Sequence, residues 1–317
     1  WYTMFNSESW SKLSERAYGY KTEKFSHNGF DIFYSHVKND IGEYLIAPSF
    51  GDFISINAEN FEALERFSES NNHMAIKIKV CSETRPDLHN YKVVESGFIH
   101  QVEYNSHQDW RNDIIKCKFR NQIVQPEKKG ICVEILSDKE SLRKFYHMHV
   151  LLRINKFNEI PQPWQYFECI YDKYFAQNKG FVIHAYDPEG NLIAGILFIV
   201  DGGIVYYKFS ASYLEALQYR PNNLLMDRLI QYCDEKGIKK LNLGFTGSSE
   251  AYQGLRKYKL HAGASEYPRY MLKTPLYSKL NTEIIAEINK QVAELIKTNP
   301  SLDDVDQFSS QYYKYFI

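Results

Sequence analysis

The chain has 317 residues, of which 44% are hydrophobic and 24% are charged. This balance is typical of a globular protein with a large core, and the length favours two domains over one. The formal net charge is −1, so no overall field draws the protein to nucleic acid or anionic lipid. No apolar run approaches the roughly 20 residues of a membrane span and no secretory signal is visible, so we expect a cytoplasmic protein.

The five cysteines stand far apart in the sequence and form no Cys-X-X-Cys pair. An even, regularly spaced set would indicate a disulfide framework, and closely spaced pairs would indicate a structural zinc site. The observed spacing favours neither and fits a reducing compartment. We therefore expect no metal.

The second half of the chain has the clearest pattern. Residues 131–136 have the length and β-branched content of a strand, and Ser137 with Glu140 predicts a capping box at the start of a helix. Another helix is expected over 164–177. Three strands separated by short Gly-, Pro- and Asp-containing turns follow, which indicates an antiparallel meander. The strands of this meander are predicted over 181–186, 192–200 and 204–209.

A helix follows the meander, with Pro221 at its expected first position and Gly237 at its end. The pattern then predicts a strand over 240–245, a short helix over 250–260 and a last strand over 267–273. The resulting order is β, α, α, β, β, β, α, β, α, β. A three-stranded meander that leads into one helix and then a strand is the skeleton of the GNAT (Gcn5-related N-acetyltransferase) fold.

The first half resembles a shortened copy of this unit. Strands are predicted over 31–37, 44–47, 74–80 and 98–104, and helices over 9–18, 61–70 and, with many basic residues, 109–129. We therefore expect an α/β protein with a mixed sheet and two tandem GNAT-like domains. Residues 1–125 are the predicted degenerate copy, and residues 126–277 are the copy predicted to hold the donor site.

Residues 278–317 are predicted to form a helical tail. An apolar stripe at helical spacing marks one face of it. The stripe consists of Ile284, Ile288, Val292 and Leu295. Packing of this face onto the body of the protein is the favoured interpretation, and a dimer helix is the alternative, so both a monomer and a homodimer are expected states.

The start of the helix at Pro221 is the strongest candidate for a binding site. A helix N-terminus presents unpaired backbone N–H groups and the positive end of the helix dipole, which together favour a phosphate or diphosphate. Arg220 can add a forked cationic donor. An ordinary capped helix has the same features, so the interpretation depends on the meander that precedes it. The residues assigned to the donor site are Tyr219, Arg220, Pro221, Asn222, Asn223 and Leu224.

Transfer of an acyl group to an amine needs a positioned carbonyl, polarisation of that carbonyl and a route for the amine's proton. Tyr206, Tyr207 and Lys208 lie on the strand before the binding helix, and Asn242 lies on the strand after it. Because side chains alternate along a strand, either Tyr207 or the pair Tyr206 and Lys208 faces the cleft, and the pattern leaves both open. His184 is a further candidate base, although a lone histidine on a strand is more often structural.

From Phe119 to Tyr267 the chain resembles the FemAB-like branch of the GNAT superfamily, and the resemblance extends more weakly back to Ser9. Each matching segment is a weak signal, whereas their order and spacing together are fairly specific. The segments are 118–123 (KFRNQI), 142–157 (LRKFYHMHVLLRINKF), 192–195 (LIAG), 206–212 (YYKFSAS), the Pro221 helix, 241–244 (LNLG) and 258–264 (YKLHAGA).

The resemblance implies tandem GNAT domains and transfer of an acyl or aminoacyl group to an amine. It implies that Lys259 polarises the carbonyl or the transition state, and that Arg153 and Lys156 contact the acceptor. The expected catalytic residues are Lys259, Tyr207 and Lys208, and the expected substrate contacts are Arg153, Lys156, Tyr206 and Asn242.

The expected donor is acyl-CoA, and the expected acceptor is an amine of a small molecule or sugar precursor in cell-envelope or polysaccharide biosynthesis. Fem-type ligases use aminoacyl-tRNA and a cell-wall precursor instead. This chain lacks the coiled-coil arm of some Fem ligases and has no strongly basic signature, so tRNA is the alternative donor. A non-catalytic GNAT-fold binding module is the third interpretation.

Overall fold

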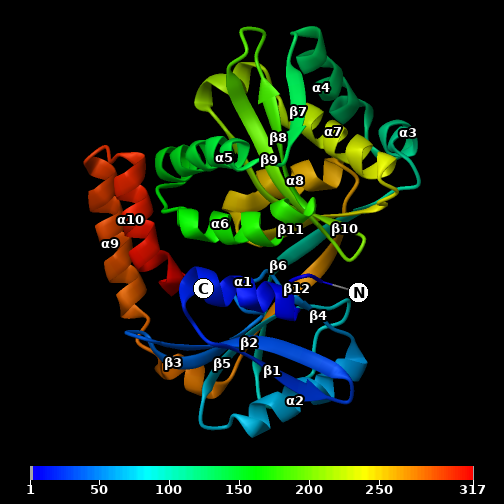
Figure 1. The fold of residues 1–317 in the computed structure, drawn as a ribbon. Coiled ribbons are helices and arrows are strands. Elements are labelled where there is room, and N and C mark those ends of the chain that lie inside the picture. Colours follow the sequence, from blue (N-terminus) through cyan, green and yellow to red (C-terminus); the bar gives the residue numbers. More distant parts are fainter. Residues whose placement is uncertain (1–2, 317) are drawn as a thin grey trace.

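The computed structural model describes residues 3–316 of the chain. Within this range the strands form one mixed sheet of 12 strands in the order β1-β2-β3-β5-β12-β6-β11-β10-β9-β8-β7, with β4 beside β5. Figure 1 shows this sheet running through a lower lobe, built mainly by the first half of the chain, and an upper lobe, built mainly by the second half. The predicted α/β class with a mixed sheet is confirmed.

The strands of the first half are β1 (Thr22–His27), β2 (Phe30–Asn39), β3 (Gly42–Ala47), β4 (Ile54–Ser55), β5 (Ala75–Cys81) and β6 (Lys92–Glu103). Those of the second half are β7 (Cys132–Leu136), β8 (Gly180–Tyr186), β9 (Leu192–Asp201), β10 (Ile204–Ser212), β11 (Lys240–Gly247) and β12 (Ser265–Lys273). The sequence pattern predicts all of these except β1 and β4.

The helices are α1 (Glu8–Tyr18), α2 (Phe61–Ser70), α3 (His107–Asp109), α4 (Cys117–Lys128), α5 (Lys139–Leu152), α6 (Trp164–Lys173), α7 (Asn222–Glu235), α8 (Gln253–His261), α9 (Glu283–Lys297) and α10 (Leu302–Tyr312). α10 lies within the predicted helical tail of residues 278–317, although the apolar stripe marks only the helix that corresponds to α9. None of the helices in residues 3–316 combines the length and the apolar character that a bilayer span requires.

The predicted continuous helix over 109–129 is wrong. A π-helical turn, Trp110–Ile114, follows α3, and the extended backbone of Ile115 then separates it from α4. The Arg120 guanidinium satisfies carbonyls at this break, because Nε lies 2.7 Å from the Arg111 oxygen and Nη2 lies 2.7 Å from the Asn112 oxygen. An arginine that looks like part of a basic helix surface is therefore a structural cap.

The predicted cap at the start of α5 is displaced by one residue. The N-cap is Asp138, not Ser137, and its carboxylate accepts hydrogen bonds from the backbone N–H and hydroxyl of Ser141 at 2.8 and 2.7 Å. Aspartate caps a helix as well as serine does, so the sequence offered two adjacent starts of similar quality.

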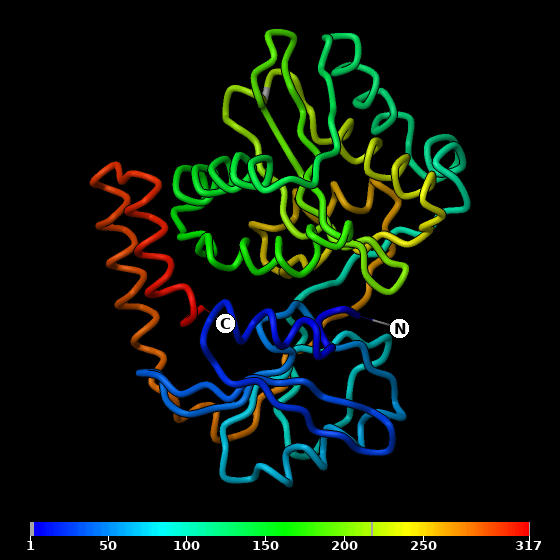
Figure 2. The backbone as a smooth tube through the Cα atoms, viewed as in Figure 1, coloured from blue at the N-terminus to red at the C-terminus, as the bar shows by residue number. Residues whose placement is uncertain are grey.

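The two lobes exchange strands where they meet. β12 from the second half lies between β5 and β6 and pairs with both in antiparallel register, and β6 from the first half pairs with β11. In Figure 2 the chain descends from the upper lobe, passes through the lower one and returns along the side as α9. The division of the chain at residues 125 and 277 stays a prediction, since the sheet continues across it.

In the first half, the parallel strands that correspond to those flanking the predicted donor site of the second half remain paired. β3 pairs with β5 from Tyr44↔Ala75 to Ala47↔Ile78, and β4 continues with Ile54↔Val80. Residues 48–53 leave the sheet between these two segments as a loop. The first copy therefore has no gap between these strands. The loop of residues 48–53 contacts the other lobe through Asp52 and Lys208.

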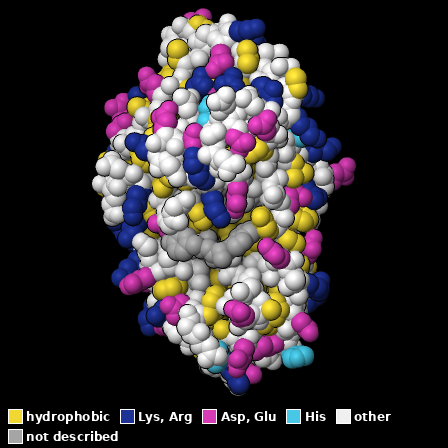
Figure 3. Space-filling view, turned by 90° about the vertical axis from the view of Figure 1, so that its right-hand side faces the viewer, with side chains coloured by type: hydrophobic (Ala, Val, Ile, Leu, Met, Phe, Trp, Pro, Cys, Tyr) yellow, Lys and Arg dark blue, Asp and Glu magenta, His cyan; other side chains and the backbone are white. Residues whose placement is uncertain are grey.

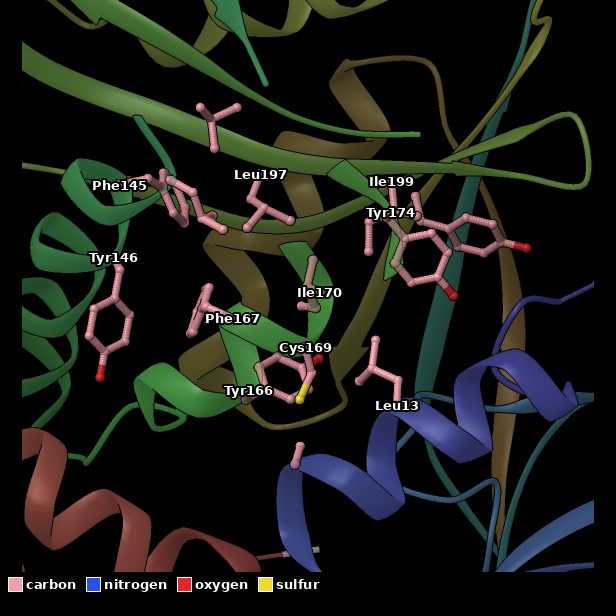
Figure 4. Packing of buried hydrophobic residues seen from close by; sticks show 14 of the residues in the cluster. Leu13, Phe145, Tyr146, Tyr166, Phe167, Cys169, Ile170, Tyr174, Leu197 and Ile199 are labelled. Carbon is pink, nitrogen blue, oxygen red and sulfur yellow. The ribbon is translucent and has the colours of Figure 1, made fainter. Parts of the chain in front are cut away.

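The lobes share a hydrophobic core. Its largest cluster joins Phe5, Trp10 and Leu13 of the first half to α5, α6 and β9 of the second. Figure 4 shows Leu13 on α1 directed toward Cys169 and Ile170 of α6. The tail packs within the chain as well, because Ile288 and Val292 of α9 are buried against Ile160.

Candidate acyl-transfer site

Two parallel strands of the upper lobe part in the middle of the sheet. β10 and β11 pair at Ile204↔Lys240, Val205↔Leu241 and Tyr206↔Asn242, and not beyond, although β10 continues to Ser212 and β11 to Gly247. Both strands are irregular where they part, β10 against β9 between Tyr207 and Phe209, and β11 against β6 between Asn242 and Gly244. The facing edges leave a gap in which unpaired backbone groups can bind an extended ligand.

The N-terminus of α7 lies on the segment that connects these strands. The helix begins at Asn222, and its N-cap Pro221 offers no side-chain hydrogen bond to the first turn. The backbone N–H groups of the first turn have no acceptor within a helix, and the helix dipole adds partial positive charge there. Arg220 precedes the helix, is exposed and has a positive φ of 51°. This end of α7 can bind an anion.

The assigned donor-site residues divide into two groups. Tyr219 is half-buried, and Arg220 and Asn222 are exposed. Asn223 is instead buried, and its amide nitrogen lies 3.2 Å from Gln122 Oε1 on α4. Leu224 packs in the core below. Asn223 and Leu224 can therefore contribute only backbone N–H groups to an anion site.

The structure shows which side of the sheet each side chain of β10 faces. Tyr206 is buried toward the first half, where its hydroxyl accepts a hydrogen bond from the Met4 backbone N–H at 3.1 Å. Lys208 lies on the same side. Tyr207 lies on the opposite side against the α7 cluster, and burial raises its pKa to about 12. A phenol with this pKa stays protonated at neutral pH and can act only as a hydrogen-bond donor or acceptor.

Asp52 is a site residue that the sequence analysis did not identify. It lies on the loop between β3 and β4, and its Oδ2 lies 3.4 Å from Lys208 Nζ. A Cβ atom placed on Gly244 would lie 4.0 Å from the same Oδ2 and 3.7 Å from the Tyr207 carbonyl oxygen. The first half of the chain thus places a carboxylate at the mouth of the gap.

The carboxylate of Asp52 is surrounded by cations. Burial opposes its ionisation, but Lys208, Lys79 and Arg269 together hold its pKa below the ordinary value. Arg269 is buried, donates to the Asp52 carbonyl oxygen at 3.2 Å and stacks on the Phe245 ring at 3.4 Å. Burial and neighbouring cations lower the pKa of Lys79 well below its ordinary value, although the residue is only half-buried. The surroundings of the Asp52 carboxylate are therefore electropositive.

Lys259 lies behind β11 at the gap. Its Nζ donates to the carbonyl oxygens of Gly244 and Phe245 at 3.3 and 3.0 Å and to Thr246 Oγ1 at 2.9 Å. The residue is 5% exposed. Burial lowers its pKa to about 7, and Asp52 opposes that decrease. A group with this pKa can gain or lose a proton at neutral pH.

The remaining candidates lie elsewhere. Arg153 pairs with Glu159 and lies over the Phe157 ring, and Lys156 is exposed over the same ring, at the C-terminal end of α5. His184 is fully buried on β8, its Nδ1 lies 3.2 Å from the Tyr186 hydroxyl, and burial lowers its pKa to about 4. The structure brings together Lys208, Lys259, Asn242 and Asp52 instead. The Asn242 side chain shapes the gap by accepting the Gly244 N–H at 2.8 Å.

Residues 118–267 match the family model for the acetyltransferase (GNAT) domain. A search of the curated proteins found no match. Among solved structures, that of FemX resembles the chain with a TM-score of 0.63 at 15% sequence identity, and the likeness covers 90% of this chain and 94% of FemX.

Two further structures also match over nearly the whole chain. One is the C-terminal domain of a protein assigned as lysylphosphatidylglycerol synthetase from Agrobacterium fabrum, with a TM-score of 0.58, 14% identity and coverage of 90% and 92%. The other is L-PGS from Bacillus licheniformis, with a TM-score of 0.55, 11% identity and coverage of 96% of both chains. At such identities the likeness shows the fold. The chain therefore shares a GNAT-like fold with these proteins, and residues 118–267 are similar to the acetyltransferase (GNAT) domain.

Proposed function

We propose that the protein transfers an acyl group from acyl-CoA to an amine in the cytoplasm. The observation that carries this proposal is the gap between β10 and β11, which begins after Tyr206 and Asn242 and lies beside the uncapped N-terminus of α7. The pantetheine arm would pair with the exposed backbone of β10, and the diphosphate would accept hydrogen bonds from the first turn of α7. Exposed Arg220 would add a charged contact to the diphosphate.

Lys259 and Asp52 would serve the transfer itself. The Lys259 ammonium lies at the gap and would stabilise the negative charge that develops on the donor carbonyl. Asp52 is ionised at neutral pH and would attract and orient the acceptor's ammonium group. The catalytic function of both residues is a proposal, as is that of Lys208, which would position Asp52 from 3.4 Å.

The acceptor would bind beside the Asp52 carboxylate. Lys79 and Arg269 lie near this carboxylate, so the site favours an acceptor that carries a carboxylate or phosphate besides its amine. Small-molecule or sugar-linked precursors of envelope components or polysaccharides have this chemistry. Arg153 and Lys156 lie farther along, at the end of α5, and would contact only a longer acceptor.

Binding of the donor tests this proposal directly. Coenzyme A and acetyl-CoA, titrated into the wild-type protein, should raise its melting temperature, because ligand at 100 times Kd adds roughly 2.7 kcal/mol. Asn222→Asp places a carboxylate at the exposed first position of α7 and should weaken binding without loss of stability, since an acidic residue suits a helix N-terminus. The matched control is Asn299→Asp after α9. Equal CoA affinity in both variants, or no stabilisation of the wild type, would reject the donor site.

An aminoacyl-tRNA donor is the second candidate. Lys129 is exposed beside the donor segment, and its Nζ lies 2.7 Å from the Gln218 carbonyl oxygen. Lys118 and Lys128 are also exposed on α4, which packs against α7. FemX and L-PGS share the fold. On the face in Figure 3, however, basic and acidic side chains are interspersed. Retention of tRNA that falls steeply with salt and is weakened by Lys118→Gln would favour this candidate.

A further inference from the structure

A chain of hydrogen bonds leads from Lys259 away from the gap. Lys259 Nζ lies 2.9 Å from Thr246 Oγ1, which lies 3.4 Å from Nδ1 of His100. His100 Nε2 lies 2.8 Å from Glu266 Oε1. Nε and Nη2 of Arg256 then lie 2.6 and 2.7 Å from the two oxygens of Glu266. These residues come from α8, β11, β6 and β12, so the chain crosses the strand exchange between the lobes.

This chain of hydrogen bonds has a buried end at Lys259 and an accessible end at Arg256. Lys259, Thr246 and His100 are 5%, 1% and 0% exposed, whereas the side chains of Glu266 and Arg256 are 18% and 30% exposed. His100 faces both partners because it pairs with Gly244 across one edge of β6 and with Glu266 across the other. The register of the exchanged strands therefore fixes the order of the chain.

The direction of each hydrogen bond follows from Arg256. Its two donors bind Glu266 as a carboxylate and hold the pKa of Glu266 below the ordinary value. A carboxylate only accepts, so Nε2 of His100 carries a proton. Burial and the nearby Lys259 lower the pKa of His100, which favours the neutral ring. A neutral ring with its proton on Nε2 accepts the Thr246 hydroxyl proton at Nδ1. The Thr246 oxygen then presents a lone pair to Lys259.

We propose that Glu266 and His100 are positioning residues that favour the ammonium form of Lys259 at the gap. With the Thr246 hydroxyl directed toward His100, the three acceptors around Lys259 call for three N–H donors. The ammonium supplies three, whereas the neutral amine supplies two and directs a lone pair at the third acceptor. Reversal of the chain would turn the hydroxyl toward the nitrogen and favour the neutral amine. Asp52 is the other charged group that faces Lys259, from the loop before β4, and it favours the ammonium too.

The catalytic value of this arrangement rests on the proposed function, because it supplies a positive charge for the donor carbonyl. The first half, whose own parallel strands do not part, would thus contribute to the site through His100. A simple structural role for His100 would not depend on which ring nitrogen carries the proton, whereas this role does.

The titration of Lys259 tests the inference without any substrate. The Cε signal of Lys259 in ¹³C-lysine protein, assigned with Lys259→Arg, gives the midpoint by NMR. Glu266→Gln can donate to Nε2 and so reverse the chain, and we expect it to lower the midpoint by about one pH unit. His100→Leu interrupts the chain of hydrogen bonds and should lower the Lys259 midpoint as well. His100→Gln can donate to Glu266 and accept from Thr246, and should restore the wild-type midpoint.

The control is His184→Leu, which removes another fully buried histidine outside the chain and should leave the midpoint unchanged. An unchanged midpoint in folded Glu266→Gln would overturn the inference, and so would an equal shift in His184→Leu. Failure of the protein to bind CoA would reject the proposed donor and leave these midpoints as they are. With an active protein, Glu266→Gln should lower kcat and leave KM for the donor unchanged.

Discussion

Tyr206 and Asn242 form the last pair between β10 and β11, and the side chains of these two residues hold that point in place. The Tyr206 hydroxyl is bound to the Met4 backbone, and the Asn242 amide oxygen is bound to the Gly244 N–H. Both contacts lie within the protein, so these side chains shape the gap. Hydrogen bonds within the protein therefore stabilise the point at which β10 and β11 part. Contact of these side chains with the acceptor stays a prediction.

We expect the stability contributed by Lys259 to depend on pH. Its pKa is about 7 in the folded protein and near the ordinary value of about 10.4 when unfolded, so the unfolded chain binds more protons between these values. Stability from this group therefore rises with pH from about 7 to about 10 and is constant below 7. Lys259→Met removes the effect.

Urea unfolding of the wild type and Lys259→Met at pH 7 and pH 9 measures this dependence. The free energy of unfolding of the wild type should increase relative to the variant between the two pH values. Lys257→Met, which changes an exposed lysine on the same helix, is the matched control and should show no such trend. A parallel response of all three proteins would mean that Lys259 is not buried as a near-neutral amine.

Asp52→Asn should destabilise the protein at neutral pH, because it leaves Lys208, Lys79 and Arg269 without their shared carboxylate. Breaking a fully buried ion pair costs about 3–5 kcal/mol. Asp52 is partly exposed, so we expect about 2 kcal/mol. The pKa of Asp52 is lowered on folding, so its contribution is present above the unfolded pKa and is lost as the pH falls through the folded value.

Chemical unfolding at pH 7, with and without added sulfate, checks the effect of Asp52. Sulfate should stabilise Asp52→Asn more than the wild type, since an anion can take the place of the lost carboxylate among the cations. Asp40→Asn, on the turn between β2 and β3, is the control. Equal stability of wild type and Asp52→Asn would show that the three cations do not depend on this carboxylate.

The parts of the site formed by neighbouring sequence could be predicted. The meander, the turn at Pro221 and the strand after α7 each have local signals in strand alternation, turn residues and helix ends. These signals predict a donor site between β10 and β11, and the two strands part there. Asn223 shows the limit, because a small polar residue at a helix start gives no sign that α4 will bind its side chain.

The parts formed by distant sequence could not be predicted. Asp52 and Lys208 are separated by 156 positions, and His100 and Glu266 by 166. No spacing rule links such pairs. His100 and Glu266 meet through the pairing of β6 with β12, and Asp52 meets Lys208 where the loop before β4 contacts β10. The pairing of β4 with β5 in the first copy could not be predicted either, because a strand of two residues, Ile54–Ser55, has no periodic pattern.

Asn223→Ala should affect stability rather than binding of the donor. Its side chain links α7 to α4 through Gln122 Oε1 and the Phe119 carbonyl oxygen. Loss of such a buried contact costs about 1–2 kcal/mol. Thermal melts should show the decrease, and the affinity for CoA in the folded variant should stay within about twofold of the wild type. A large loss of affinity at unchanged stability would indicate that the side chain turns toward the donor.

Arg220→Gly should separate backbone strain from ligand binding. Arg220 has a φ of 51°, which costs a side-chain-bearing residue about 1–2 kcal/mol and glycine almost nothing. Glycine also gives the unfolded chain about 0.4–1 kcal/mol more entropy. These effects oppose each other, so stability should change by less than about 1 kcal/mol. The guanidinium is lost at the same time, and with it a charge-assisted contact to phosphate of about 1.5–3 kcal/mol.

The dissociation constant for CoA should therefore rise by about 10- to 100-fold in Arg220→Gly, measured by calorimetry, with little change in the melting temperature. Arg220→Asn is the matched variant, since asparagine also accepts a positive φ and lacks the charge, so it should bind as weakly as the glycine variant. Arg220→Lys keeps the charge and should lose less affinity. If all three variants bind CoA as the wild type does, the positive side chain before α7 has no contact with the donor, and the helix N-terminus binds the diphosphate through its backbone alone.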